Sequence, residues 1–189
     1  MSTEFTIGKY LEAHRSLGVR LDLESIEQAI SLIKATSESG KKVITCGNGG
    51  SAYTASHYIT DWNKMVNIHT GKQFRGFSLA DNIGLITAFG NDLSYDEIFS
   101  GQLATIVDEG DLLIGISGSG NSPNVLKAIS LANEIGASTL AIVGYDGGKL
   151  KSLAKQSVHI PSFDMQLCED YHLMFGHMVM KALCASPIN

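Results

Sequence analysis

Apolar residues recur at helical spacing at both ends of the chain. Residues 5–19 and 23–33 each carry apolar side chains at intervals of three and four, and Gly40 closes the second stretch. The same periodicity returns over residues 166–183. Side chains spaced in this way share one face of a helix, so the pattern predicts two N-terminal helices and one closing helix.

Between these ends, short β-branched runs alternate with helical stretches. A buried parallel strand reads as a short continuous apolar run, and strands separated by helices favour a parallel sheet that is covered on both faces. Residues 63–75 are expected to form a loop that covers either a sugar or an interface. The predicted strands are 41–46, 74–80, 111–117, 138–144 and 157–161, and the predicted helices are 51–62, 83–89, 95–107, 123–136 and 149–156.

The chain has the length of one ordinary domain. Its 189 residues contain no long linker, low-complexity tract or internal repeat. We expect a single domain over 1–189, with N-terminal helices in 1–40 and an α/β core with a closing helix in 41–189.

The composition and charge of the chain indicate which kinds of molecule it binds. Hydrophobic residues make up 44% of the chain, and some of this apolar surface is expected to cover a subunit interface. The net charge of −5 and the absence of a Lys/Arg cluster argue against nucleic acid and membrane surfaces. No stretch approaches the roughly 20 apolar residues of a membrane span, so a cytoplasmic location is expected. The three cysteines have no CxxC spacing, which predicts neither a disulfide framework nor a thiolate metal site.

Two loops rich in glycine and serine follow predicted strands. The loops are GNGGS at 47–51 and SGSGNS at 117–122, and each leads into a predicted helix. Glycines let a backbone approach a ligand closely, and N–H groups at a helix start favour phosphate. Neither loop matches a nucleotide-binding motif, so no nucleotide cofactor is expected. An alternative interpretation, which the residues leave open, is that the glycines of 47–51 make only a tight turn.

Parallel strands present their carboxyl ends at one edge of a sheet, where ligands of open α/β folds bind. The two loops are therefore expected to face one crevice and to hold one phosphate group through hydroxyls and N–H groups. Ser122 also fits a simple helix cap, a role compatible with a phosphate contact. The hydroxyls proposed for this contact are those of Ser51, Ser117, Ser119 and Ser122.

One helix face behind the first loop carries candidate acid–base groups. His57 and Asp61 are four residues apart, so both point into the same space. A buried histidine bonded to a backbone carbonyl is the alternative interpretation of His57.

Five motifs taken together resemble the phosphoheptose isomerases of the sugar isomerase (SIS) family. The motifs are CGNGGSA (46–52), AFGND (88–92), LLIGISGSGNSPNVLKAI (112–129), GYDGGKL (144–150) and EDYHLMFGH (169–177). The resemblance implies a doubly wound, flavodoxin-like α/β/α sandwich with a five-stranded parallel sheet. It also implies a homotetramer with sites between subunits, and conversion of D-sedoheptulose 7-phosphate to D-glycero-D-manno-heptose 7-phosphate through an enediol, for bacterial lipopolysaccharide or capsule.

The resemblance assigns roles by position. The family's catalytic carboxylate falls on Asp61 and its catalytic histidine on His177. The resemblance and the two loops also predict substrate contacts other than the four serines. These residues are Asn48, Gly49, Gly50, Asn91, Asp92 and Gly118. The metal ligands described for some members fall on His57, Asp61, Glu169 and His177.

Three positions depart from the family pattern. Asp61 stands for a glutamate, Glu169 for a glutamine and Gly118 for a threonine. Two imidazoles and two carboxylates suit a divalent ion such as Zn²⁺ better than a set with an amide. Along a helix, however, Glu169 and His177 are about 12 Å and roughly 80° apart, a long span for one ion. We expect Zn²⁺ here, with Asp61 or Glu169 as base and His177 as acid.

Two other functions stay open, as do the roles of three residues. A non-catalytic binding protein of the same fold, like relatives that tether the bacterial replication initiator, is one alternative, and an isomerase for another ketose phosphate is the second. Glu169 and Asp170 lie near a predicted helix start, where negative charge is favourable without any catalytic role. His172 is expected to be structural or to support the site indirectly.

Overall fold

The computed structural model describes residues 5–185, and a five-stranded sheet forms its centre. The strand order is β2-β1-β3-β4-β5 and every pair is parallel. This is the doubly wound order with the switch point between β1 and β3. The strands are β1 (Val43–Gly47), β2 (Gly76–Ser78), β3 (Leu112–Ser117), β4 (Ser138–Val143) and β5 (Gln156–His159).

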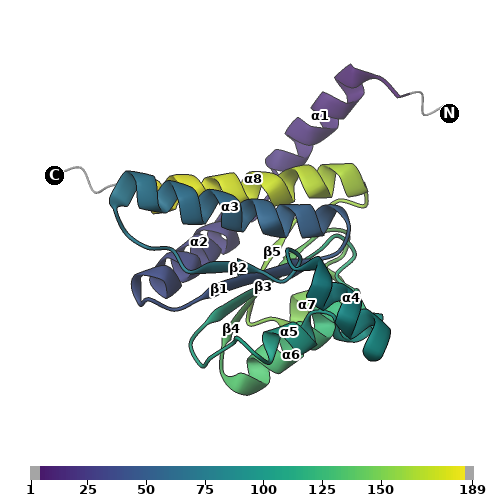
Figure 1. The fold of residues 1–189 in the computed structure, drawn as a ribbon. Helices are drawn as coiled ribbons and strands as arrows, with labels where there is room; N and C mark the ends of the chain where they lie inside the picture. The colour runs from purple at the N-terminus through teal and green to yellow at the C-terminus, as the bar shows by residue number, and fades with distance from the viewer. Residues whose placement is uncertain (1–4, 186–189) are drawn as a thin grey trace.

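Helices cover both faces of the sheet (Figure 1). The longer helices α2, α3 and α8 pack on one face, and α5, α6 and α7 pack on the other with α4 beside them. The helices are α1 (Ile7–Gly18), α2 (Leu23–Glu38), α3 (Gly50–Thr70), α4 (Ile83–Asp92), α5 (Ser100–Leu103), α6 (Pro123–Ile135), α7 (Gly148–Leu153) and α8 (Met165–Cys184), with a 3-10 turn η1 at Tyr95–Glu97. The predicted α/β/α sandwich is confirmed.

Alternation along β3 divides the interior into two cores. Leu112, Ile114 and Ile116 face the α2, α3 and α8 layer, whereas Leu113 faces the α6 layer. All of them are buried completely, because a central parallel strand has no solvent-facing side. Gly115 lets α6 come close, since a Cβ there would lie 2.9 Å from a methyl group of Val125.

A buried carboxylate ties the strands together at the amino edge of the sheet. Asp111 is inaccessible to solvent and accepts hydrogen bonds from the backbone N–H groups of Lys42 and Asp108, both at 2.8 Å. The ammonium of Lys42 lies 2.9 Å from the same carboxylate. Three donors therefore compensate the desolvation of this charge.

Helix α1 extends away from the body of the molecule (Figure 1). It is attached through Leu17, which is buried in the core shared with α8, and through two hydrogen bonds. Tyr10 donates a 2.6 Å hydrogen bond to Asp170, and Tyr171 donates one of 2.6 Å to the carbonyl of His14. The bond to Asp170 raises the pKa of Tyr10 to about 12. None of the helices in residues 5–185 has both the length and the hydropathy that crossing a bilayer requires.

Two predicted elements differ from the structure. Helix α3 does not end at Trp62 but runs on to Thr70, where Gly71 ends it with a φ of 68°. Most of the predicted loop 63–75 is therefore helix, because Val66 continues the buried stripe of α3. The single helix predicted over 95–107 is a 3-10 turn followed by the four-residue α5, in which Gly101 packs on the ring of Phe89.

Strand and helix ends shift elsewhere by a few residues. The strand predicted over 74–80 keeps only Gly76–Ser78, and the helix predicted over 83–89 extends to Asp92. Helix α7 ends at Leu153 and the strand after it begins at Gln156. Element ends are set by tertiary contacts as much as by local sequence.

Candidate functional site

The two glycine and serine loops meet at the switch point of the sheet. Strand β1 ends at Gly47 and pairs with β3, whose end is Ser117, so both loops leave from the same edge. Helices α3 and α6 begin directly after them, and neither has a hydrogen bond from a capping side chain. The N–H groups of Gly50 and Ser51 are thus available to an anion at the positive end of the α3 dipole. Helix α6 starts with Pro123, which has no N–H, and the N–H of Val125 donates to the Asn124 side chain.

A pocket of about 150 Å³ lies between these loops. The four serines that the sequence singled out all line it, so the structure brings them together. No lysine or arginine is among the lining residues, so a bound anion would be held by hydroxyls, N–H groups and helix dipoles. The lining residues are Asn48, Ser51, Ile116, Ser117, Gly118, Ser119, Ser122, Met165 and Glu169.

Ser122 occupies the cap position of α6 without acting as a side-chain cap. Its hydroxyl lies 3.1 Å from that of Ser117, inside the pocket. Gly49 has a φ of 54° at the start of α3, so the first loop does need glycine for its turn. The loop makes a tight turn and also borders the pocket, so the two interpretations are compatible.

An amide pair closes one side of the pocket. The side chains of Asn48 and Asn124 exchange two hydrogen bonds of 2.9 Å, and Tyr95 donates a 3.0 Å bond to the Asn48 side chain. Sequence reasoning missed Asn124 and Tyr95. The only signal for Asn124 was its place in the first turn of a predicted helix, next to the serine loop.

A second group of side chains gathers on α3 and α8. The Nε2 atoms of His57 and His177 are 3.1 Å apart, and an Asp61 carboxylate oxygen lies 3.4 Å from the first and 3.9 Å from the second. Their side chains are exposed by 42%, 48% and 27% in the order His57, His177, Asp61, so substrate or solvent can reach them. His57 is therefore not the buried, carbonyl-bonded histidine of the alternative interpretation.

This donor set fits a zinc ion. A tetrahedral zinc with ligand bonds of about 2.0–2.2 Å has ligand atoms about 3.3–3.6 Å apart. The ligand atoms of His57, Asp61 and His177 all lie within 4.8 Å of one another. Two imidazole nitrogens and one carboxylate oxygen are also the ligands of many catalytic zinc sites, which keep a further position open.

Close packing of α3 on α8 creates this cluster. Trp62 donates a 2.9 Å hydrogen bond to the carbonyl of Gly176, and Tyr58 donates one to the carbonyl of His172. Gly176 faces the Tyr58 ring, and a Cβ on Gly176 would collide with it. The small residue therefore lets the two helices approach closely and brings His177 to His57.

Glu169 lies at the pocket and not in the histidine cluster. It lines the pocket, and its carboxylate is 2.6 Å from where a Cβ on Gly50 would be. From Gly50 to His57 is seven residues, which is about 10 Å along α3 and close to two full turns. Within one chain, Glu169 therefore lies at the serine pocket and apart from the cluster, and its role as a fourth ligand stays a prediction.

Two predicted site residues lie outside the pocket, and one residue that was not predicted lines it. Asn91 and Asp92 lie exposed at the end of α4 and do not line the pocket, although Asn91 donates a 2.9 Å bond to Asp92. Met165, which sequence reasoning missed, fills the space beside Gly118, where a Cβ would lie 2.7 Å from its sulfur.

His172 is buried and sits behind the site. Only 1% of it is exposed, and among the described residues neither ring nitrogen has a hydrogen-bond partner. Burial lowers the pKa of its imidazole to about 4, so the ring is neutral near pH 7. This supports the structural role expected for it.

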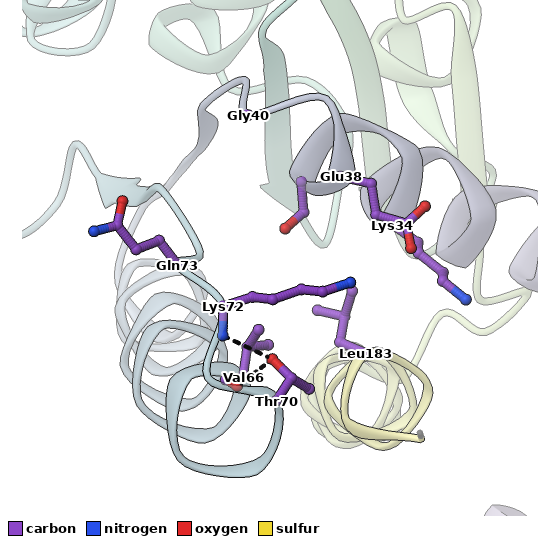
Figure 2. Close-up of a pocket in the computed structure, with 9 residues that line it drawn as sticks. Lys34, Glu38, Gly40, Val66, Thr70, Lys72, Gln73 and Leu183 are labelled. Carbon is purple, nitrogen blue, oxygen red and sulfur yellow. Dashed lines mark hydrogen bonds between the residues drawn. The ribbon is translucent and has the colours of Figure 1, made fainter. Parts of the chain in front are cut away.

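A larger hollow of about 430 Å³ lies far from this chemistry, where α2, α3 and α8 end (Figure 2). Lys34, Glu38, Thr70, Lys72 and Leu183 are among the residues that line it. Its lining contains no histidine, aspartate or cysteine. Although this hollow is larger than the serine pocket, the histidine cluster therefore remains the candidate for acid–base chemistry.

Comparisons with known proteins identify the family of the chain. A profile of the SIS domain matches residues 9–144. A phosphoheptose isomerase of Helicobacter pylori is 36% identical over 181 residues, which are 94% of this chain and 93% of that protein. The similarity is therefore not confined to the pocket but extends over nearly the whole chain.

Solved structures give the same result. The phosphoheptose isomerase of Neisseria gonorrhoeae superposes with a TM-score of 0.83 at 29% identity, covering 94% of this chain and 98% of that one. A phosphoheptose isomerase from Francisella tularensis superposes with a TM-score of 0.87 at 26% identity, covering 94% and 95%.

Proposed function

Because the chain belongs to the SIS-domain family, and within it to the phosphoheptose isomerases, we propose that its substrate is D-sedoheptulose 7-phosphate. It is a sugar-phosphate isomerase, and the proposed product is D-glycero-D-manno-heptose 7-phosphate, a precursor of bacterial heptose units.

One relationship supports the proposal most: the anion pocket and the acid–base cluster lie along the same helix, about 10 Å apart. At roughly 1.3 Å per bond, an extended heptulose 7-phosphate places C1 about 10 Å from its phosphorus atom. A substrate phosphate between Ser51 and Ser119 thus leaves the carbonyl end beside His57, Asp61 and His177. Each carbon fewer shortens this reach by about 1.3 Å, which favours a heptulose over shorter ketose phosphates.

The proposed reaction moves a proton between two carbons. Asp61 removes a proton from C1 while His177 protonates the oxygen on C2, which gives an enediol. The O1 proton then leaves and C2 receives a proton, which completes the aldose. Glu169 lines the phosphate pocket, so in this arrangement it would contact the sugar near the phosphate, and Asp61 is the base.

We also propose that His57, Asp61 and His177 can hold a zinc ion, with Glu169 reaching it only if the carboxylate moves. A ring nitrogen or carboxylate oxygen bound to zinc cannot carry the transferred proton at the same time, so these residues act either as ligands or as the acid–base pair. Zinc would supply Lewis-acid polarisation of the carbonyl when bound. A histidine cluster on two packed helices is a rigid base for such a site, because Gly176 and Trp62 fix the helix spacing.

We also propose that copies of the chain assemble, as a homotetramer with sites between subunits. Large apolar side chains on and beside α1 support this: Phe5, Ile7, Leu11 and Val19 are exposed by 74%, 73%, 59% and 84%. So much apolar surface on one projecting segment is typical of an interaction site. The cytoplasmic location expected from the sequence stays a proposal that suits a phosphorylated, charged substrate.

Incubation with sedoheptulose 7-phosphate in D₂O, followed by NMR, tests the function. Deuterium is expected at C2 of the aldose and, through the reverse reaction, at C1 of the ketose. Asp61→Asn should slow exchange by about 10²–10⁴-fold, while Asp108→Asn, at the opposite edge of the sheet, should leave it unchanged. Pentulose and hexulose phosphates run in parallel decide the substrate class. Absence of exchange with every sugar at high enzyme concentration would favour a binding protein instead.

A further inference from the structure

A second turn lies directly behind the serine loop. The segment 144–150, which joins β4 to α7, donates backbone hydrogen bonds from Gly144 to the carbonyl of Gly118 at 3.0 Å and from Leu150 to the carbonyl of Gly120 at 2.9 Å. Strand β4 is the neighbour of β3 in the sheet, so both loops leave from the same edge. The turn 144–150 is thus a brace for the loop that forms the anion pocket.

Asn121 links the two segments from its side chain. Its Nδ2 donates a 3.0 Å hydrogen bond to the carbonyl of Ser119, and its Oδ1 accepts a 3.1 Å bond from the N–H of Lys149. The residue itself does not line the pocket. One amide therefore uses its donor on the serine loop and its acceptor on the brace.

Glycines make the contact between the segments possible. Gly120 has a φ of 65° and Gly148 a φ of 53°, both in the left-handed region that favours glycine. A Cβ on Gly120 would collide with the carbonyl of Gly147, and one on Gly148 with the carbonyl of Ser119. The two backbones touch, so a movement of the brace displaces the serine loop.

This arrangement fixes the direction of three successive carbonyls. Those of Gly118, Ser119 and Gly120 all accept hydrogen bonds from the brace or from Asn121. In a trans peptide the C=O of one residue and the N–H of the next point in opposite directions. Fixing the Gly118 carbonyl on the brace therefore turns the N–H of Ser119 to the other side, and it removes a partial negative charge from the path of a phosphate.

The N–H groups of Gly120 and Asn121 are already bonded inside the loop, to Ser117 and to the Ser119 hydroxyl. We propose that Asn121 is a positioning residue for phosphate recognition: it holds the serine loop with the Ser119 N–H and the serine hydroxyls toward the substrate. The inference rests on the proposed function, because it assigns the pocket to the phosphate of the sugar. Phosphate contact is the same in the ground state and the transition state, since the reaction takes place at the far end of the sugar. Loss of Asn121 therefore weakens binding and leaves turnover nearly intact.

Asn133 offers a matched control. It too is an asparagine of the α6 layer whose side chain bridges two segments, donating 3.0 Å to the carbonyl of Leu153 and accepting 2.8 Å from Thr139. These bonds hold the other end of α7, and Asn133 does not line the pocket. Asn133→Ala thus measures the general effect of removing such a bridge.

The experiment measures KM and kcat for sedoheptulose 7-phosphate, and the inhibition constant of inorganic phosphate, in wild type, Asn121→Ala and Asn133→Ala. We expect Asn121→Ala to raise KM and the phosphate inhibition constant together by about five- to ten-fold, with kcat within about two-fold. Asn133→Ala should change neither KM nor the phosphate inhibition constant. This should hold even if urea unfolding shows that Asn121→Ala and Asn133→Ala lose similar amounts of stability. Asn121→Ser, whose short hydroxyl can reach only one partner, should lie between wild type and alanine, and it replaces the alanine variant if that fails to fold.

The outcomes separate this inference from the proposed function. If wild type turns over the sugar but Asn121→Ala and Asn121→Ser keep its KM and phosphate constant, the positioning role is wrong and the function stands. Equal changes in Asn121→Ala and Asn133→Ala would also overturn it, because the effect would then be general destabilisation. If wild type neither isomerises the sugar nor binds inorganic phosphate, the proposed function itself fails.

Discussion

The Nε2 atoms of His57 and His177 lie 3.1 Å apart, although 120 positions separate the two residues in the chain. A neutral imidazole has one donor and one acceptor nitrogen, so two facing Nε2 atoms need either one shared proton or a common cation. Asp61 adds a carboxylate oxygen to the same space. This pair is where the acid–base and metal hypotheses meet.

Zinc content follows directly from this pair. Protein purified without chelator is expected to carry about one zinc per chain, and both His57→Ala and His177→Ala should lose most of it because each removes one of three ligands. Elemental analysis by mass spectrometry measures this independently of activity. His69→Ala, an exposed histidine near the end of the same helix, is the control. Less than a tenth of an equivalent of zinc per chain in the wild type would contradict the zinc proposal.

Gly176→Ala should separate the two helices that carry the cluster. A methyl group at this buried position meets the ring of Tyr58, which has no room to move. Overpacking of this kind costs about 1–3 kcal/mol, and the shift of α8 should also lower zinc content and kcat. Urea unfolding measures the stability. Gly8→Ala, on the exposed side of α1 with nothing within 4 Å of its Cβ, should be neutral or slightly stabilising.

Asp111→Asn should destabilise the fold without touching catalysis. An amide presents N–H groups where two backbone donors and the Lys42 ammonium now bind, so buried donors are left unpaired. We expect a loss of about 3 kcal/mol in urea unfolding, with kcat of the folded protein unchanged because the network lies at the amino edge of the sheet. Asp108→Asn, at a side chain that is 73% exposed, should cost less than about 1 kcal/mol. Similar losses for the two variants would contradict the role given to burial.

Acid sensitivity should depend on His172. The folded pKa of about 4 lies below the roughly 6.5 of an unfolded histidine, so the unfolded state binds the extra proton between these values. Stability therefore falls as the pH drops from about 6.5 to 4, by about 3 kcal/mol from this residue. Urea unfolding at pH 7 and pH 4.5 should show a smaller difference for His172→Leu than for wild type, whereas His69→Leu should match wild type. An unchanged difference in His172→Leu would mean that other groups cause the acid loss.

Leu11→Glu should disrupt assembly. The residue is 59% exposed on α1, and a charge there cannot be buried against another copy without a large cost. We expect a smaller mass in light scattering coupled to size exclusion, with the helical content of the fold retained. Glu12→Gln, on the same helix at an exposed polar position, should leave the mass unchanged. A wild type that is already monomeric would overturn the assembly proposal.

Much of the fold was predictable because its signals are local. Buried strands such as 111–117 are short apolar runs, and Gly136 ends α6 as the sequence predicted, with a φ of 91°. The error at Trp62 arose because the stretch after it is polar on one side, while the packing of Val66 that continues the helix comes from a distant part of the chain.

The sequence by itself determined the parallel α/β class and the two glycine and serine loops after its strands, because periodicity, glycine turns and helix starts are properties of neighbouring residues. The resemblance to a family added the doubly wound order and the candidate acid–base groups. Only the tertiary structure decided which of them meet: α3 and α8 pack closely at Gly176 and bring His57 to His177, while the same packing places Glu169 at the serine pocket. Spacing along one helix fixes distances within that helix alone, so contacts between segments far apart in the chain depend on how side chains such as Tyr58 and Met165 fill the space between them.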